Sequence, residues 1–320
     1  HILFVADEHV LFRRKGVPAE FEKARYSQLF DHLLNLSVSN YCAAVIHGGD
    51  CFDRAPTIQE TALVVRYLNA VVKPTYVISG NHEQIKKDTT FFTYLKRVTS
   101  LLNPLVTIID DYYTHPTGEF DIIPYNRLKQ YHPKDIDFHA DILFTHVRGD
   151  IPPHVKAEVN LELFDRWKVV LAGDLHSYEN SQRNILYPGS PVTTSFHRNT
   201  VDTGVILFDT ENFTHDWVPL KLPQLLRRTI QAGDDMPATE YHHTIYEVEG
   251  DMAELANIAD SALIDKKVSK RESDTALILD PTMTLQEELE EYLLYILQVN
   301  ETTVQEVLHV FNNNKDKIHD

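Results

Sequence analysis

Cysteine and long apolar runs are both scarce in this chain of 320 residues, and its first residues are not basic. The two cysteines, Cys42 and Cys51, exclude a disulfide scaffold and a cysteine-rich zinc module, and they fit a reducing, cytoplasmic environment. The apolar runs are far shorter than the ~20 residues that a membrane span needs. The start, His1–Asp7, has neither a basic region nor a small-residue cleavage site, so we expect no signal peptide.

Positive charge is also scarce, but its distribution is uneven. The chain has 30 Lys and Arg against 47 Asp and Glu, a formal net charge of −17. Residues 1–230 carry 24 basic and 27 acidic residues, whereas residues 231–320 carry 6 and 20. A nucleic-acid-binding protein is usually basic, because neutralised phosphates release counterions. The total argues against such a partner, but the near-neutral first 230 residues weaken that objection.

The order of apolar and polar segments predicts an α/β fold. Strands are expected at 2–6, 43–46 and 75–78, with helices at 18–36 and 57–72 between them. This rhythm is typical of an α/β sheet. Later strands have few helices between them and are expected at 105–109, 120–124, 141–145, 169–172, 204–208 and 214–218. They predict a second sheet packed face to face with the first, with helices outside, over residues 1–220.

The rest of the chain predicts two smaller parts. Pro219 and Pro223 mark a boundary, and residues 221–283 suggest a small α/β domain with a strand near 246–249 and a helix near 252–262. Residues 284–320 have the apolar spacing of two amphipathic helices, with apolar positions at Leu289, Leu293, Ile296, Val304, Leu308 and Phe311.

Five of the apolar runs end in polar clusters. These are Asp7-Glu8-His9, Gly49-Asp50-Cys51-Phe52-Asp53, Gly80-Asn81-His82-Glu83, Thr145-His146 and Gly173-Asp174-Leu175-His176. In α/β sheets, ligands bind at the carboxyl ends of strands. Oxygen and imidazole donors without thiolate suit Mn, Mg, Fe or Zn. A single strand-end histidine is more often structural, but five such clusters in series predict a metal centre.

The order of these clusters resembles that of the calcineurin-like metallophosphoesterases, over residues 2 to about 220. A further segment, Leu186-Tyr187-Pro188-Gly189-Ser190-Pro191, resembles the Y-x-G-S-P segment of SbcD-type nuclease subunits. Two more segments resemble the recombination exonuclease subunits of tailed bacteriophages, namely 145–149 (THVRG) and 172–178 (AGDLHSY). The resemblance implies a four-layer αββα sandwich with a small α/β capping domain and C-terminal helices.

The resemblance also implies a ligand set for two divalent metals, Mn most of all, with Mg as the alternative. One metal would be bound by Asp7, His9 and His176, the second by Asn81, His146 and Asp174, and Asp50 would bridge both. Asp174 departs from the family, which usually has His at this position. A carboxylate is a harder ligand, which favours Mn or Mg over softer ions.

The family's catalytic histidine matches His82, whose expected task is to help the leaving 3′-oxygen depart. Asp53 would have a supporting role, either near the phosphate or in contact with a metal-binding side chain. Glu83 would orient a metal-binding side chain. Two bound metals would activate a water and hold the phosphate. Several basic residues near the motifs could contact the DNA backbone, namely Arg13, Arg14, Lys15, Lys86, Lys87, Arg127, Lys129, Arg148, Lys156 and Arg198.

The function implied is that of a DNA exonuclease or endonuclease subunit in recombination, repair or degradation, located in the host cytoplasm if phage-encoded. It would act with an SbcC-type ATPase, as a homodimer within a heterotetramer. Residues 221–283 would cap the site or bind DNA. The C-terminal helices would dock on the ATPase through the apolar positions given above. A self-contained helical hairpin is the alternative for these helices.

Two other functions compete with this hypothesis. A serine/threonine protein phosphatase would share the Asp50–Arg54 and Gly80–Glu83 segments, but Ala55 stands where that family prefers Gly. The Asp7-Glu8-His9 cluster also lacks that family's G-D-x-H-G context. A non-catalytic scaffold is disfavoured, because the ligand set is complete and includes His82.

Overall fold

The computed structural model describes residues 1–86, 88–97, 102–134, 136, 138–238, 240–269, 283–297 and 299–314. The chain forms two compact units. The first comprises His1–Thr229, Asp235–Glu247 and Asp260–Lys266, and the second comprises Ile230–Asp234, Val248–Ala259 and Lys267–Asp320. None of the helices in the described part is both long and apolar enough to span a bilayer.

The first unit contains a six-stranded sheet of order β13-β12-β1-β2-β3-β6. Its four parallel strands are β1 (Ile2–Val5), β2 (Ala44–His47), β3 (Thr75–Ile78) and β6 (Val106–Ile109). Beside β1, the antiparallel strands β12 (Gly204–Asp209) and β13 (Thr214–Pro219) extend the sheet. The motif loops therefore leave β1, β2 and β3 at one common edge.

A second sheet has the order β11-β10-β9-β8-β7. The strands β8 (Asp121–Ile123), β9 (Ile142–His146), β10 (Val169–Gly173) and β11 (Ile185–Leu186) are parallel, and β7 (Tyr113–Thr114) is antiparallel. The two central strands of this sheet, β9 and β10, carry the remaining motifs.

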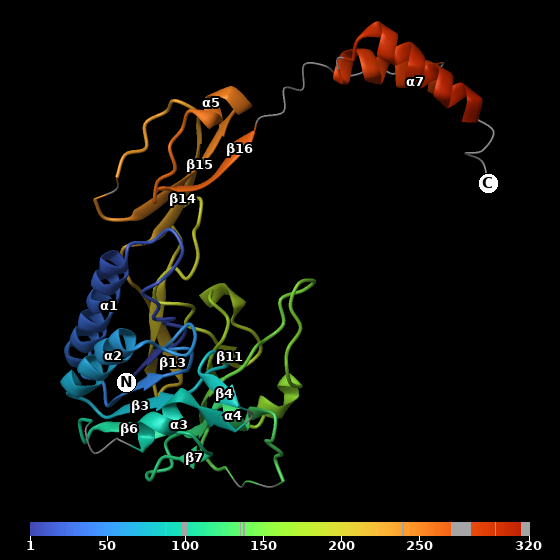
Figure 1. Ribbon diagram of the computed structural model, residues 1–320. Helices are drawn as coiled ribbons and strands as arrows, with labels where there is room; N and C mark the ends of the chain where they lie inside the picture. Colours follow the sequence, from blue (N-terminus) through green and yellow to red (C-terminus); the bar gives the residue numbers. More distant parts are fainter. Residues whose placement is uncertain are drawn as a thin grey trace. The chain divides into compact units, whose positions relative to one another are not determined.

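Alternate residues of the strands divide the core into layers. Ile2 and Phe4 of β1 share a buried cluster with Ile142 and Phe144 of β9, which places the two sheets face to face. Leu3 and Val5, on the opposite face of β1, pack toward the helices α1 (Ala19–Ser39), α2 (Ile58–Ala70) and α3 (Phe91–Lys96). The other face of the second sheet packs against α4 (Tyr125–Leu128) and the 3-10 helix η2 (Leu161–Phe164). This confirms the predicted four-layer sandwich, and α1 and α2 lie side by side on its outer face (Figure 1).

Local sequence explains where the two long helices begin. α1 starts directly after Pro18, a residue that suits the first turn because its fixed φ is already helical. α2 starts at a capping box, in which the Thr57 side chain accepts from the Glu60 N–H and the Glu60 carboxylate accepts from the Thr57 N–H.

Residues 221–283 form a three-stranded sheet of order β14-β15-β16, as far as they are described. Its strands are β14 (Leu225–Gln231), β15 (His243–Gly250) and β16 (Ile264–Ser269). The helix expected at 252–262 is shorter, because α5 (Met252–Ala256) ends where the chain turns toward β16. A hairpin of β4 (Gln84–Lys86) and β5 (Thr89–Thr90), and the 3-10 helix η3 (Tyr178–Asn180), were not expected.

The C-terminal helices are α6 (Leu285–Glu291), the π-helical turn η4 (Tyr292–Ile296) and α7 (Glu301–Asn314). Leu293, Val304 and Leu308 are buried against one another. These three expected docking anchors therefore hold the hairpin together and are closed to a partner. The side chain of Ile296 lies outside the described residues. Exposed apolar side chains remain at Leu285, Tyr292, Leu297, Val307 and Val310.

Candidate metal centre

All eight predicted site residues follow or end parallel strands of the two facing sheets. Asp7 and His9 follow β1, Asp50 follows β2, and Asn81 and His82 follow β3; His146 ends β9, and Asp174 and His176 follow β10. The packing of the sheets brings these strand ends together. Three groups of described side chains could each hold a metal ion, with ligand atoms within 4.8 Å: Asp7, His9 and His176; His9, Asp50 and His82; Asp7, Asp50 and His146.

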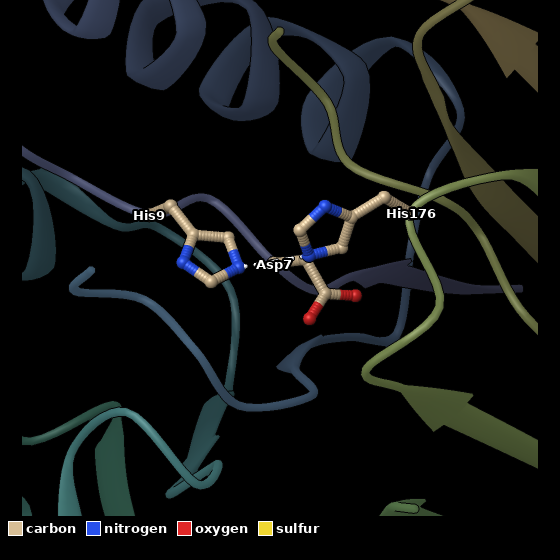
Figure 2. A group of neighbouring side chains, drawn as sticks. All are labelled: Asp7, His9 and His176. Atoms are coloured by element: carbon tan, nitrogen blue, oxygen red, sulfur yellow. Dashed lines mark hydrogen bonds between the residues drawn. The ribbon is translucent and has the colours of Figure 1, made fainter. Parts of the chain in front are cut away.

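The first group has a geometry that suits one cation. Figure 2 shows the rings of His9 and His176 facing each other beside the carboxylate of Asp7. Their Nε2 atoms are 3.0 Å apart. Burial, followed by the charge of His9, lowers the pKa of His176 to about 4, so its ring is neutral and keeps a lone pair. Two imidazole nitrogens directed at one point suit a shared metal ion.

Asp50 lies between the groups. Its Oδ2 is 3.7 Å from Nε2 of His9, 3.5 Å from Nε2 of His146 and 3.8 Å from Nε2 of His82. Burial alone would raise the pKa of Asp50, but these imidazoles outweigh it and hold the pKa below the ordinary value. A carboxylate in this central place can give one oxygen to each of two ions.

The remaining predicted ligands surround the side-chain oxygen of Asn81. This oxygen lies 2.9 Å from Nε2 of His146 and 3.2 Å from an oxygen of each of Asp50 and Asp174. Oxygen atoms so placed repel one another, and the contact is relieved if the amide turns or if a cation lies between them. An oxygen and imidazole set of this kind suits a hard divalent metal.

The charges at the site also favour a cation. Burial raises the pKa of Asp7 well above its usual value, and the neighbouring carboxylates of Asp50 and Asp174 add to the shift. Burial would lower the pKa of His146, but the charges of Asp50, Asp7 and Asp174 together outweigh it and raise the pKa to about 10. His146 therefore holds a proton among these carboxylates, in a place where a divalent metal would supply the positive charge.

His82 differs from the ligands in its surroundings. Its Nδ1 lies 2.5 Å from the carbonyl oxygen of Asp53, which can only accept, so the proton is on Nδ1. Nε2 faces Asp50, and the side chain is 38% exposed. The main-chain N–H of His82 donates to Oδ1 of Asp50. His82 is thus oriented by Asp53, with Nε2 turned to the site and open to solvent.

The loops that carry these residues are strained. Asp7, His9, Asp50 and Asp174 all have positive φ, which is uncommon for residues other than glycine. Such conformations persist where the surroundings over-determine them, and they gather at functional sites. Glycine allows the close approach of neighbouring loops, since a Cβ at Gly80 would lie 2.1 Å from Oδ1 of Asp50.

Buried hydrogen bonds hold the loops in place. Glu83 accepts the N–H groups of Asp50, Gly80 and Phe52, so one carboxylate joins the loops after β2 and β3. The hydroxyl of Ser190, in the Tyr-Pro-Gly-Ser-Pro segment, donates to the carbonyl oxygen of Asp7. These contacts give the expected supporting role of Glu83 a physical basis, and they give one to the segment at 187–191.

Sequence reasoning missed a buried ionic network behind the site. Arg25 pairs with Glu22 and donates to the carbonyl and hydroxyl oxygens of Thr193. Arg14 contacts Glu22 and the carbonyl oxygen of Thr194. Arg14 is therefore not a free DNA contact: it holds the cleft loop, whose Thr194 hydroxyl lies 3.2 Å from Nδ1 of His176. The three charged residues are close in sequence, but Thr193 lies 168 residues after Arg25, so no local pattern signals this contact.

A cleft of about 890 Å³ opens over the centre. Its walls include Asp50, Asn81, His82, Asp174 and His176, and farther along Tyr178 and Trp217. Arg148, expected only as a DNA contact, also lines the cleft and pairs with Asp174 through two hydrogen bonds. The cleft gives an extended substrate access to the candidate ligands Asp50, Asn81, Asp174 and His176.

Comparisons with known proteins agree with this geometry. The calcineurin-like phosphoesterase family matches residues 1–184. The chain is 36% identical to the probable exonuclease subunit 1 of Escherichia phage T5, over 96% of each chain. It is 25% identical to a putative phosphoesterase of Invertebrate iridescent virus 3, over 70% of this chain and 67% of the relative. It is also 35% identical to the DNA double-strand break repair protein Mre11 of Methanosarcina acetivorans, over 26% of this chain and 14% of the relative.

Proposed function

This chain belongs to the calcineurin-like phosphoesterase family, and from that premise we propose that it is the nuclease subunit of a DNA-processing complex. The convergence of the imidazole, carboxylate and amide donors of the predicted ligand set beneath one open cleft carries the proposal. Its likeness to a phage protein named as an exonuclease subunit supports DNA as the substrate. Hydrolysis of phosphodiester bonds in recombination, repair or degradation is the reaction we propose.

The proposed ligand set divides between two metals, Mn in preference to Mg. Asp7, His9 and His176 would hold one, Asn81, His146 and Asp174 would hold the other, and Asp50 would be shared between them. Such metals would supply an activated water and positive charge for the phosphate. The chain then orients its ligands, as when Nδ1 of His146 donates to the carbonyl oxygen of Gly48 and keeps Nε2 on the site.

His82 provides the acid of the reaction in this proposal. In the doubly protonated ring, Nδ1–H donates to the carbonyl oxygen of Asp53 and Nε2–H faces the cleft. Water attacks phosphorus and loses a proton to solvent, the P–O bond to the leaving 3′-oxygen breaks, and that oxygen takes the Nε2 proton. The histidine then regains a proton from solvent. A general acid positioned in this way contributes about 10²–10⁴-fold to a rate.

The partner that we propose is an SbcC-type ATPase, bound by a homodimer of this chain through the C-terminal helices. Because Leu293, Val304 and Leu308 are buried in the hairpin, the docking face is redefined by the exposed Leu285, Tyr292, Leu297, Val307 and Val310. An amphipathic helix can bind a groove through exposed apolar side chains. We also propose that residues 221–283 cap the site or bind DNA.

A nuclease assay, run beside a phosphopeptide assay, tests this function. The full chain is incubated with linear duplex, circular duplex and single-stranded DNA, and separately with a phosphoserine peptide, in EDTA, Mg or Mn. Each DNA reaction is run with and without ATP and the ATPase partner. We expect Mn-dependent release of nucleotides from DNA, no activity in EDTA, and loss of activity in Asp50→Asn. Cleavage of the phosphopeptide alone would establish the protein phosphatase instead.

A further inference from the structure

Arg148 and Asp174 form a bidentate ion pair within the cleft. Nε of Arg148 lies 2.9 Å from Oδ2 of Asp174, and Nη2 lies 3.2 Å from Oδ1. Both oxygens of the carboxylate are therefore engaged by one guanidinium. Such paired hydrogen bonds are charge-assisted and stronger than neutral ones.

Asp174 stands apart from the other acids of the site. The three candidate metal groups among the described residues contain Asp7 and Asp50 but not Asp174. Yet Asp174 is placed to bind, because its side chain is 6% exposed, its Oδ1 lies 3.8 Å from Nε2 of His146, and its N–H donates to both oxygens of Asp7. The acid is in position, but its oxygens are occupied.

Arg148 is fixed at its backbone and accessible at its side chain. Its N–H donates to Oε1 of Glu158, a part-buried bond 3.0 Å long, while its side chain is 43% exposed and lines the cleft. The guanidinium can therefore change partner without moving the strand end that carries His146. Its planar fork matches a phosphate as well as it matches a carboxylate.

We propose that Arg148 is a phosphate-binding residue that exchanges between Asp174 and the phosphate of the bound substrate, and that this exchange releases Asp174 to the second metal. A metal ion entering beside Asn81 and His146 needs an oxygen of Asp174 and repels the adjacent guanidinium. A substrate phosphate gives the guanidinium another acceptor. Substrate and second metal thus promote each other's binding, which is reciprocal by linkage. This inference rests on the proposed function, because it names how the same site takes its substrate.

Calorimetric titration of MnCl₂ into the metal-free full chain tests the exchange. Each titration is run with saturating thymidine 5′-monophosphate, which has the phosphate, or with thymidine, which lacks it. In the wild-type protein we expect the second Mn to bind more tightly with the monophosphate, by about 5- to 150-fold, the usual range of such coupling. Electron paramagnetic resonance of free Mn gives the same stoichiometry without relying on heat.

Arg148→Gln removes the competing cation. In this variant the second Mn should bind more tightly than in the wild type when thymidine is present, and the difference between monophosphate and thymidine should disappear. The variant also corrects for binding of Mn to the nucleotide in solution, which is the same for both proteins. Arg183→Gln is the matched control, because Arg183 pairs with Asp165 in an exposed place outside the cleft and should behave as wild type.

Arg148→Lys provides a second test if the glutamine variant does not fold. Lysine keeps the charge but presents a single point donor, so it should weaken the hold on Asp174 and reduce the dependence on the monophosphate. The inference is overturned if wild-type titrations with monophosphate and thymidine agree, if only one Mn binds, or if Arg148→Gln retains the wild-type difference. If the monophosphate tightens binding of the second Mn but DNA is not cleaved, the nuclease function alone is overturned. If DNA is cleaved but the monophosphate does not change Mn binding, the exchange alone is overturned.

Discussion

The side chain of His82 is oriented by two of its neighbours. The carbonyl oxygen of Asp53 fixes the proton on Nδ1, and the His9 ring lies edge-on at 4.7 Å. The ring is therefore held in one orientation on two sides, and Nε2 faces the cleft.

His82→Ala should reduce DNA cleavage by about 10²–10⁴-fold, because one positioned acid is lost. Binding of two Mn ions should persist, since the ligand set proposed here does not include His82. Single-turnover cleavage and calorimetry measure the two effects separately. His115→Ala removes a histidine away from the cleft and serves as control. Near-normal turnover of His82→Ala would refute its role, and loss of a metal would make it a ligand.

Asp174→His should change which metals support cleavage. The substitution introduces a softer ligand and removes the partner of Arg148, so Zn and Co should gain relative to Mn and Mg. Cleavage rates and metal affinities are measured for all four ions in both proteins. Identical orders of preference would show that residue 174 does not contact a metal.

At the scale of elements, the loops after β2 and β3 are joined by one carboxylate. Oε2 of Glu83 accepts from the N–H groups of Asp50 and Gly80, and Oε1 accepts from that of Phe52. The strained conformation of Asp50 persists because such contacts fix it from several sides.

Glu83→Gln should therefore destabilise the fold by about 1–3 kcal/mol, because the amide NH₂ faces at least one N–H that loses its acceptor. Urea unfolding in EDTA measures the change without any contribution from metal. Glu211→Gln, at an exposed glutamate, should stay within about 0.5 kcal/mol of wild type. An unfolding midpoint shared by all three proteins would show that the Glu83 contacts add nothing to stability.

At the scale of the whole molecule, the chemistry and the C-terminal helices belong to different compact units. Every predicted metal ligand lies in the first unit, and α6, η4 and α7 lie in the second. The hairpin also has its own buried cluster of Leu293, Val304 and Leu308.

Deletion of residues 284–320 should leave Mn-dependent cleavage of single-stranded DNA intact and abolish ATP-stimulated degradation of duplex DNA with the ATPase. Affinity co-purification of the two proteins should be lost at the same time. Val307→Asp with Val310→Asp tests the exposed face in the full chain and should weaken co-purification by at least about tenfold. Loss of metal binding on truncation would place these helices in the core, and an unchanged complex would refute the docking face.

The sequence by itself determined the central strands and the main helices, and it named the candidate residues of a metal centre. Apolar runs that end in polar clusters are local patterns, and they located β1, β2, β3, β9 and β10 together with the side chains that follow them. The hairpin of β4 and β5 escaped because its first strand is exposed and polar, without the alternation that marks a half-buried strand. Periodicity predicted the C-terminal helices, but it reports only spacing along the chain. It therefore could not show which apolar side chains of the two helices pack against each other.

Only the tertiary structure decided which contacts hold the loops of the centre in place and which side chain pairs with Asp174. The pairing of Arg148 with Asp174, the contact of Arg25 with Thr193, and the bond from Ser190 to Asp7 all join separate segments. The backbone of Asp7, which accepts the bond from Ser190, is left-handed, as are those of His9 and Asp50. Such contacts depend on the packing of one sheet on the other, and packing is set by the whole core rather than by the neighbours of a residue along the chain.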